Sequence, residues 1–244
     1  MKITEINAKT LPDLWYQVLW NLYHKVRDND GARRYKVQTG SFAGVDRIEL
    51  DLAVLHVEMP WVRPLFPQIP ENLPIPPPCD EKYLNDYMLY LLSPEVHPNE
   101  HYTYGNRLMV GFQKCIDYYK KHGTDTNRMC LEIGRPEDID LYDLESGEGS
   151  SPCLRLIDTR VLNGKLNFIT YFRSWNAYSG LPMNLAGLQQ VKELMASEIG
   201  VEDGELIAIS KGLNIREHEL EVVSARLYKD YDKELGKYNS GQVL

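Results

Sequence analysis

The sequence contains little that would indicate a metal site, a membrane span or a nucleic-acid surface. Its 244 residues include four cysteines, and the spacing of Cys79, Cys115, Cys130 and Cys153 fits no zinc-binding pattern. No apolar run approaches the length of a membrane span. The net charge of -8 argues against a broad surface for nucleic acid or anionic lipid. With no apolar leader at the N-terminus, we expect a cytoplasmic protein with reduced thiols and no metal.

The composition is that of an ordinary globular protein, with 43% hydrophobic and 25% charged residues. A chain of this length can bury a sizeable core, and we expect residues 1–244 to form one α+β domain. Composition predicts the helix Glu81–Leu92. The pattern of apolar residues predicts the helices Leu11–Val26, Met109–Lys121 and Leu185–Ile199, and the strands Ile48–Val57, Met129–Ile133 and Glu205–Ser210. The proline-rich stretch Pro60–Pro78 predicts an ordered extended connection between such elements.

The most informative stretch is residues 151–184. It holds Pro152-Cys153, then two alternating apolar segments joined by Asn163-Gly164, which predict a β-hairpin. Arg173-Ser174 and Gly180-Leu181-Pro182-Met183-Asn184 follow. A lone cysteine is usually a small core residue, and an Arg-Ser pair at a strand end is usually solvated. Together they predict a nucleophile and an anion-binding pair on one rigid hairpin.

The order and spacing of these motifs resemble the thymidylate synthase family, and look closest to its shorter archaeal-type branch. The family has a catalytic cysteine after proline, a hairpin, Arg-Ser, and Gly-x-Pro-x-Asn before a long helix. The resemblance implies an α+β, thymidylate synthase-like fold, in which a large mixed sheet carries helices on one face. It also implies a homodimer that pairs sheet against sheet and shares its active sites between subunits.

The resemblance implies a catalytic role for three residues. Cys153 would add covalently to ring position 6 of a pyrimidine nucleotide, which makes position 5 nucleophilic. Tyr104, in Tyr104-Gly105-Asn106-Arg107, would help to remove the proton from position 5. Asp86 takes the place of a family glutamate that acts on the ring through ordered water, and is one methylene shorter.

The remaining site residues implied by the resemblance bind substrate or cofactor. Asn184 would read the uracil edge, because an amide can donate to O4 and accept from N3. The phosphate would be held by Arg173 and Ser174, with Arg128 arriving from the partner subunit. The other positions are Gly180 in the glycine–proline motif, Asn214 at the sugar site, and Asn176 at the site of methylene-tetrahydrofolate or a methanopterin analogue.

Several positions depart from the family pattern. Gln38 precedes Thr39-Gly40 where the family has a phosphate-binding arginine, and Gly212 stands where it has a histidine for the sugar. Residues 93–101 lack the tryptophans that cover the reactive methylene. The resemblance implies methylation of dUMP to dTMP, and these departures leave hydroxymethylation of dUMP, dCMP or CMP as the alternative if water enters. A non-catalytic nucleotide-binding regulator is a second alternative, although such a protein needs no Cys153.

Overall fold

The computed structural model describes residues 1–38, 42–71, 73, 75–98, 100–141 and 151–227. The α-helices in this part of the chain are α1 (Leu11–Arg27), α2 (Glu81–Leu92), α3 (Tyr104–His122), α4 (Gly180–Ile199) and α5 (Leu220–Leu227). The strands are β1 (Ile3–Ala8), β2 (Ala32–Lys36), β3 (Asp46–Leu50), β4 (Leu52–Val57), β5 (Cys130–Glu132), β6 (Leu154–Leu162), β7 (Lys165–Phe172), β8 (Trp175–Asn176), β9 (Glu202–Ser210) and β10 (Leu213–Arg216). The described chain therefore contains both helices and strands, in agreement with the predicted α+β class.

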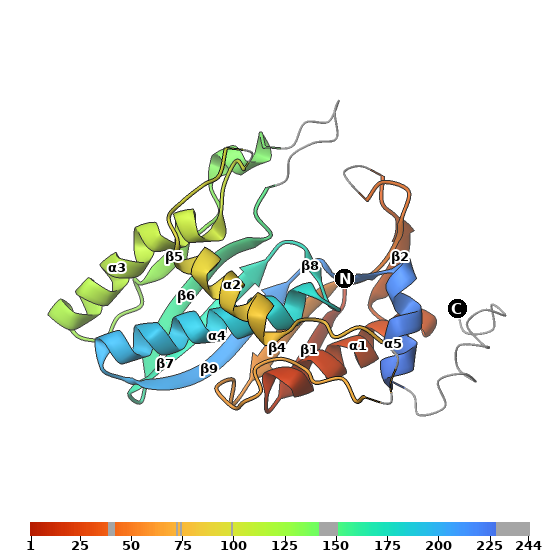
Figure 1. The fold of residues 1–244 in the computed structure, drawn as a ribbon, viewed down its shortest axis with the longest axis horizontal. Coiled ribbons are helices and arrows are strands. Elements are labelled where there is room, and N and C mark those ends of the chain that lie inside the picture. The colour runs from red at the N-terminus through yellow and green to blue at the C-terminus, as the bar shows by residue number, and fades with distance from the viewer. Residues whose placement is uncertain (39–41, 72, 74, 99, 142–150, 228–244) are drawn as a thin grey trace.

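Six strands form a large mixed sheet in the order β1-β4-β9-β7-β6-β5. The pairs β1/β4 and β7/β9 are parallel, and the other pairs are antiparallel. Figure 1 shows α2, α3 and α4 together on the viewer's side of this sheet, with α1 beside β1. The side chains beneath the helices are fully buried, as Leu55, Ala208 and Ile157 illustrate. This arrangement confirms the predicted large mixed sheet with helices on one face.

The opposite face of the large sheet carries half-exposed side chains. Strand register places Val54, Ile209, Tyr171 and Leu156 in one row across β4, β9, β7 and β6. Each of these apolar residues is half-buried rather than buried. The next row holds Ile207 beside Ile169, again half-buried. An antiparallel sheet face that meets only water normally alternates to polar residues, so the centre of this face is unusually apolar.

The β6/β7 hairpin confirms the interpretation of Asn163-Gly164. Both residues have positive φ angles, 51° and 74°, which is the backbone that a two-residue hairpin turn requires. The register shifts between Leu154 and Leu156, at the start of β6. This irregularity lies directly after Cys153, where the chain enters the sheet.

A second sheet of four strands, in the order β2-β3-β10-β8, lies beside the large one. Its existence corrects the prediction of one strand over Ile48–Val57. The chain breaks at Asp51, so that β3 joins the small sheet and β4 joins the large one. The alternating pattern hid this break because it continues from one strand into the other, and both strands bury part of their side chains.

Two helices begin earlier than hydrophobic periodicity predicts. Helix α4 starts at Gly180 rather than Leu185. Pro182 is tolerated there because the first-turn N–H groups of a helix have no intrahelical acceptor. Helix α3 starts at Tyr104 rather than Met109. Both shifts place site candidates, Asn184 and Tyr104, on helices instead of on the loops before them.

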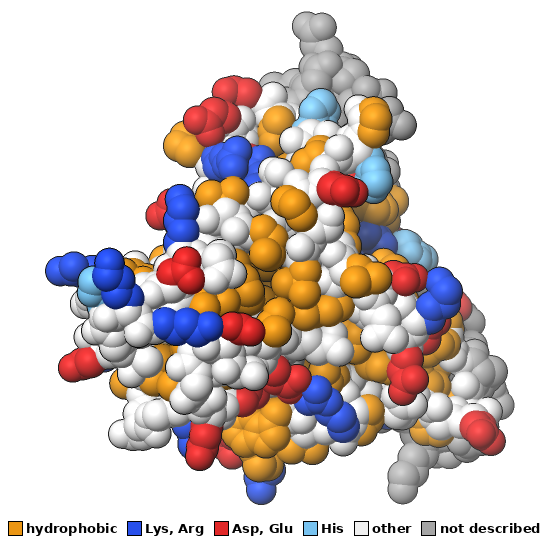
Figure 2. All heavy atoms as spheres, turned by 60° about the vertical axis from the view of Figure 1, so that its left-hand side comes forward, with side chains coloured by type: hydrophobic (Ala, Val, Ile, Leu, Met, Phe, Trp, Pro, Cys, Tyr) orange, Lys and Arg blue, Asp and Glu red, His pale blue; other side chains and the backbone are white. Residues whose placement is uncertain are grey.

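The surface of the described residues mixes charged and apolar side chains. Figure 2 shows hydrophobic side chains gathered through the middle of one face, with basic and acidic side chains around them. Exposed apolar residues of the helices include Leu89 on α2 and Val110 on α3. Among the helices of the described ranges, none is long and apolar enough to cross a membrane.

Candidate active site

Cys153 lies directly before the first strand of the β6/β7 hairpin. The preceding Pro152 is buried, and Cys153 itself is half-buried. Arg173, which follows the second strand, donates its backbone N–H to the Cys153 carbonyl at 2.9 Å. This hydrogen bond joins the two strand ends, so the thiol and the guanidinium lie at the same edge of the hairpin.

Three guanidinium groups act on the Cys153 thiol. Burial raises the pKa of the thiol, and the positive charges of Arg173, Arg47 and Arg155 act in the opposite direction. The thiolate is the reactive form of cysteine, and neighbouring cations favour it. The arginines therefore offset part of the effect of burial, although the pKa of the thiol stays above its ordinary value.

The other three cysteines lack this surrounding charge. Burial and, to a smaller extent, the nearby Asp80 together raise the pKa of Cys79 to about 12. Burial likewise raises the pKa of Cys130 to about 11, and burial alone raises that of Cys115. All four thiols are free, but only at Cys153 do arginines oppose the effect of burial.

Tyr104 lies beside the cysteine. It is the first residue of α3, which Thr103 caps by accepting a hydrogen bond from the Asn106 N–H at 2.9 Å. The Tyr104 phenol oxygen accepts the Leu154 backbone N–H at 3.3 Å. Burial raises the pKa of this phenol, and the neighbouring Cys153 raises it further. Tyr104 is therefore protonated at neutral pH and is placed to hold or transfer a proton.

A group of tyrosines extends from Tyr104 across helix α2. The rings of Tyr90 and Tyr104 meet edge to face, with centroids 6.3 Å apart, and Tyr90 stacks on Tyr87 at 5.9 Å. Tyr102 lies 6.1 Å from Tyr104 on the other side, and burial raises its pKa to about 12. Tyr90 and Tyr102 are half-exposed, so aromatic rings border the site where the family tryptophans are missing.

Asn184 lies on the second turn of α4, and protein contacts fix its amide. Its Oδ1 accepts the indole N–H of Trp175 at 2.9 Å. Its Nδ2 donates to the Tyr87 phenol oxygen at 2.8 Å. Only 9% of Asn184 is exposed, so a ligand would meet an amide that is already oriented.

Arg173 holds the segment that carries the thiol. Its Nε donates to the Pro152 carbonyl at 3.1 Å, and its Nη2 donates to the Ser151 carbonyl at 2.6 Å. Ser174 follows it and is half-buried. Arg128 is exposed in the loop before β5, where it contacts neither the thiol nor Tyr104 among the described residues. Within this chain, the structure therefore brings Arg173 to Cys153 but leaves Arg128 apart from it.

Asn176 is occupied by contacts within the protein. Its Oδ1 accepts the Ser179 backbone N–H at 2.8 Å and the Gly180 N–H at 3.4 Å, at the start of α4. Its Nδ2 donates to both carboxylate oxygens of Glu219, at 3.0 and 2.9 Å. Asn176 and Gly180 thus form the turn that starts the helix of Asn184.

Asn214 is also used internally. It is 3% exposed, and its Nδ2 donates to the carbonyls of Trp175 and Gly212, at 3.0 and 2.7 Å. Gly212 is required sterically, because a Cβ there would lie 2.7 Å from the Arg173 carbonyl oxygen. Position 212 therefore cannot carry a side chain such as the family histidine without moving the Arg173-Ser174 segment.

Asp86 takes no part in the contacts around Cys153 and Asn184 among the described residues. Its carboxylate forms an exposed ion pair with Lys82, one helical turn earlier, at 2.9 Å. The adjacent Tyr87 instead points into the site and reaches Asn184. Gln38 is exposed, and Thr39 and Gly40 lie outside the described residues.

Sequence reasoning missed two arginines of the site. Arg155 lies two residues after the cysteine, a proximity that could have indicated it. Arg47 lies on β3, opposite Arg216 and Tyr35 in the small sheet, and no local pattern links it to the cysteine. Its Nε is buried and has no hydrogen-bond partner among the described residues.

A buried carboxylate supports this edge of the site. Asp138 is 2% exposed and forms ion pairs with Arg107 at 2.6 Å and Arg155 at 2.8 Å. It also accepts the Arg135 backbone N–H at 2.7 Å. A Cβ at Gly134 would lie 2.4 Å from the Arg155 Nε. Arg155 is therefore held against the backbone by a glycine and a buried acid.

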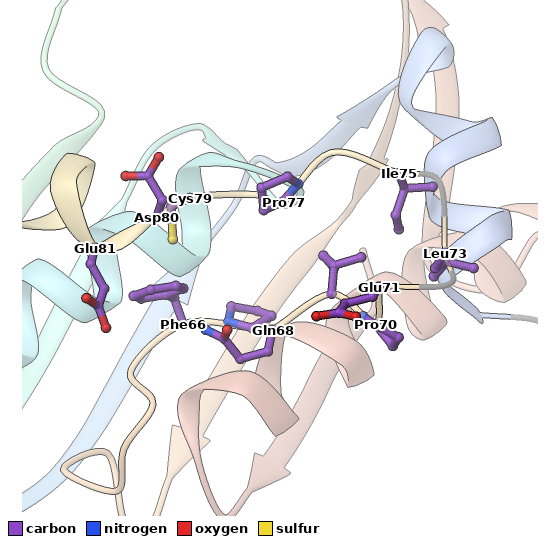
Figure 3. Close-up of a pocket in the computed structure, with 12 residues that line it drawn as sticks. Phe66, Gln68, Pro70, Glu71, Leu73, Ile75, Pro77, Cys79, Asp80 and Glu81 are labelled. Carbon is purple, nitrogen blue, oxygen red and sulfur yellow. The ribbon is translucent and has the colours of Figure 1, made fainter.

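A separate cavity of about 510 Å³ lies within the proline-rich segment. Figure 3 shows Phe66 and Gln68 on one limb of this segment and Pro77, Cys79 and Asp80 on the other. The cavity includes none of the arginines near Cys153, and its own thiol, Cys79, has a strongly raised pKa. The cavity therefore lacks the positive charges that would favour a reactive thiolate.

Within the described ranges, no group of three or more histidine, cysteine or acidic side chains could hold a metal ion. The Cys153 site combines a thiol, cations, a protonated phenol and an oriented amide. These groups can support covalent addition, anion binding, proton transfer and recognition of a polar ring edge.

Replacing Arg47 with glutamine should slow alkylation of Cys153. Loss of a positive charge raises the pKa of the thiol further, so less thiolate exists at a given pH. We expect the rate at which iodoacetamide alkylates Cys153 at pH 8 to fall about tenfold, because the loss of one nearby positive charge lowers the fraction of thiolate by about this factor. Peptide mass spectrometry across pH 7–10 would measure it. Arg33→Gln, which removes the partner of Glu49, is the control, and equal rates in both variants would contradict the role of Arg47.

Comparison with known proteins identifies relatives of this chain. A family model described as thymidylate synthase matches residues 104–239. A protein of Methanosarcina acetivorans named "Putative thymidylate synthase" is 28% identical over 225 residues, covering 89% of this chain and 92% of the relative. Like-named proteins of Methanosarcina barkeri, 28% identical over 89% of this chain and 92% of the relative, and of Methanopyrus kandleri, 27% identical over 64% and 75%, also match.

Proposed function

Because this chain belongs to the thymidylate synthase family and is a one-carbon transferase, we propose that it acts on a pyrimidine nucleoside monophosphate. The one-carbon unit goes to ring position 5 from methylene-tetrahydrofolate or a related pterin. The leading outcome is methylation of dUMP to dTMP. The single observation that carries this proposal is the half-buried Cys153, with three arginines acting on its thiol and Tyr104 beside it.

Cys153 is the proposed nucleophile. Its Sγ forms a bond to ring position 6, and the electrons of the 5,6 double bond move to the oxygen at position 4. Position 5 then attacks the one-carbon unit. Tyr104 helps to remove the remaining proton from position 5, and the electrons of that C–H bond form an exocyclic double bond as the bond between the carbon and the pterin nitrogen breaks. A hydride then adds to the exocyclic carbon, the double bond returns to positions 5 and 6, and the thiolate leaves. Bound methylene-tetrahydrofolate would supply the carbon and, for a methyl product, the hydride.

Phosphate binding is assigned to Arg173, Ser174 and Arg47. Arg47 takes the role of the family arginine whose position in this chain is occupied by Gln38. Charge-assisted hydrogen bonds to a phosphate contribute about 1.5–3 kcal/mol each. Because Arg173 also holds the carbonyls before Cys153, one side chain links phosphate binding to the position of the thiol. Gly180 lets the substrate approach the start of α4.

The pterin is proposed to lie over the half-exposed rings of Tyr90 and Tyr102. Aromatic faces suit a planar heterocycle, and these rings would limit the access of water to the reacting carbon. Asn176 would contribute only if it released Glu219. Asn214 would accept from the sugar through its oxygen, because both of its amide hydrogens are used. Asp86 would act through water after opening its ion pair with Lys82.

We propose that residues 1–244 act as one cytoplasmic domain within a homodimer. Two apolar rows on the face of the large sheet opposite the helices support the homodimer. These rows are half-exposed and are centred on Ile209, Tyr171 and Ile169. Pairing two such faces would remove apolar surface from water. Arg128, exposed beside the edge strand β5, would then reach the phosphate of the partner site.

The test is incubation with methylene-tetrahydrofolate and, in separate reactions, dUMP, dCMP or CMP. Mass spectrometry of the nucleotide products measures the outcome, and we expect methylated dUMP. The same reactions with tetrahydromethanopterin carriers identify the pterin. A protein that modifies none of the three nucleotides with either carrier would contradict the proposed function.

Hydroxymethylation is the second candidate. The observation that favours it is the absence of tryptophan from residues 93–101, which leaves tyrosines to exclude water. If water adds to the methylene before a hydride does, the product carries a hydroxymethyl group. A hydroxymethylated nucleotide in the same assay would identify this reaction. A regulator without catalysis would bind the nucleotide and keep its biological activity in a Cys153→Ala variant.

A further inference from the structure

The Trp175 side chain is held rigidly beside the Asn184 amide, which is proposed to bind the base. It is 3% exposed, and its ring stacks on Phe172 with centroids 3.9 Å apart and 3° between the planes. Its backbone N–H donates to the Gly212 carbonyl at 2.8 Å, and its carbonyl accepts from Asn214. The direction of the indole N–H is therefore set by the surrounding structure.

This N–H meets only one end of the Asn184 amide. An indole nitrogen can donate a hydrogen bond but cannot accept one. The Asn184 Oδ1 lies 2.9 Å from it. A flipped amide would bring an NH₂ group against the indole N–H, and both donors would then lack an acceptor in a buried place. Trp175 thus permits one amide orientation and disfavours the other.

The second partner of Asn184 has no such selectivity. Tyr87 presents a phenol, which burial keeps protonated by raising its pKa, and a phenol can donate or accept. Its close approach to α4 depends on Gly187, where a Cβ would lie 2.7 Å from the Tyr87 ring. Tyr87 therefore holds the amide in place but would tolerate either orientation.

The fixed amide matches one type of pyrimidine edge. With one hydrogen bond made on each side, the amide retains one acceptor position on Oδ1 and one hydrogen on Nδ2. Uracil offers the complement, an acceptor at O4 and a donor at N3. Cytosine offers a donor at position 4 and an acceptor at N3, which would need the flipped amide.

The geometry points to Trp175 as a positioning residue that makes this site select uracil over cytosine by preventing Asn184 from flipping. The inference rests on the proposed function in one respect, that Asn184 faces the base. It goes beyond it by assigning the choice of base to a residue that touches the amide rather than the nucleotide.

The test compares dUMP and dCMP binding in wild type and Trp175→Phe by calorimetry, without any pterin. Phenylalanine keeps an aromatic ring on Phe172 but removes the N–H. We expect wild type to prefer dUMP, and the ratio of the two Kd values to fall by at least about tenfold in the variant, as expected for a lost hydrogen-bond restraint. If Trp175→Phe does not fold, Trp175→His replaces it. A histidine ring nitrogen can donate or accept a hydrogen bond, so it also allows both orientations of the Asn184 amide.

Two variants serve as controls. Trp15→Phe removes another buried indole N–H, the one that donates to the Tyr178 carbonyl at 2.9 Å, and should leave the ratio unchanged. Tyr87→Phe removes the other hydrogen bond of the Asn184 amide. It should weaken dUMP binding yet keep the ratio, because Trp175 still sets the orientation.

The outcomes separate the inference from the reaction. A wild-type protein that prefers dCMP or shows no preference would overturn the inference, as would a folded Trp175→Phe variant with the wild-type ratio. A wild type that binds dUMP selectively but forms no product would leave the inference standing and would overturn the proposed reaction.

Discussion

The Cys153→Ser variant should form no measurable product from any of the three nucleotides. A serine hydroxyl is almost entirely protonated at neutral pH, and the arginines that act on the thiol cannot supply enough charge to ionise it. Removing a covalent nucleophile should lower kcat by at least about 10³-fold. Product mass spectrometry and single-turnover rates would measure this loss. Denatured wild-type reaction mixtures should contain a protein–nucleotide adduct that the variant lacks.

Cys130→Ser is the matched control for this experiment. Cys130 is free and half-buried like Cys153, and its pKa is raised to about 11 with only acidic neighbours adding to the effect of burial. We expect this variant to retain the wild-type rate. Both variants should bind nucleotide, because Arg173, Ser174 and Asn184 remain. A Cys153→Ser protein with a wild-type turnover rate would rule out covalent catalysis by this residue.

The Asp138→Asn variant should have the largest effect on stability. Asp138 is buried between Arg107 and Arg155, and Arg107 is itself 7% exposed. Removing one partner of a buried ion pair leaves an uncompensated charge and lowers the free energy of unfolding by about 3–5 kcal/mol. For a chain of this size the corresponding decrease in Tm is about 6–20 °C. Urea and thermal unfolding followed by circular dichroism would measure both.

The pH dependence of this effect has a defined sign. Burial alone would raise the pKa of Asp138, but hydrogen bonds from the Arg135 N–H and Arg107 lower it below its ordinary value. The carboxylate therefore stabilises the fold above pH 4, and this contribution is lost as the pH falls through its lowered pKa. The difference between wild type and Asp138→Asn should shrink in strong acid.

Asp86→Asn is the control for stability, since it makes the same substitution at an exposed ion pair. Asp86 pairs with Lys82 at the surface of α2, and exposed pairs of this spacing contribute about 0.3–0.5 kcal/mol. We expect little change in the free energy of unfolding. Equal destabilisation by Asp86→Asn and Asp138→Asn would contradict the role assigned to the buried acid.

Local patterns in the sequence predicted those parts of the fold that depend on a few neighbouring residues. Asn163-Gly164 defines its turn because the two backbones must take positive φ, and the hairpin follows from that. Helix α2 was predicted from its composition with its observed bounds, Glu81–Leu92, and in the structure Asp80 caps its first turn. The start of α4 was predicted five residues late, because Pro182 indicates a helix start but not its place within the first turn.

Contacts between distant segments could not be predicted in this way. Arg47 acts on Cys153 across more than 100 positions of sequence because β3 joins the small sheet, and that in turn requires the break at Asp51 that separates β3 from β4. Tyr87 reaches Asn184 only because α2 lies against α4 at Gly187. These contacts depend on the angle and distance between elements, and such quantities have no local signature.

By itself, the sequence determined the motif around Cys153, the family that the motif resembles, and the order of the main elements. Those features follow from residue type and spacing, which are properties of the chain. Only the tertiary structure decided that Asn176 and Asn214 are occupied by internal hydrogen bonds, that Arg47 and Arg155 act on the thiol, and that Trp175 orients Asn184. Hydrogen bonds need direct contact and charge effects weaken with distance, so their partners are chosen by packing and not by position in the sequence.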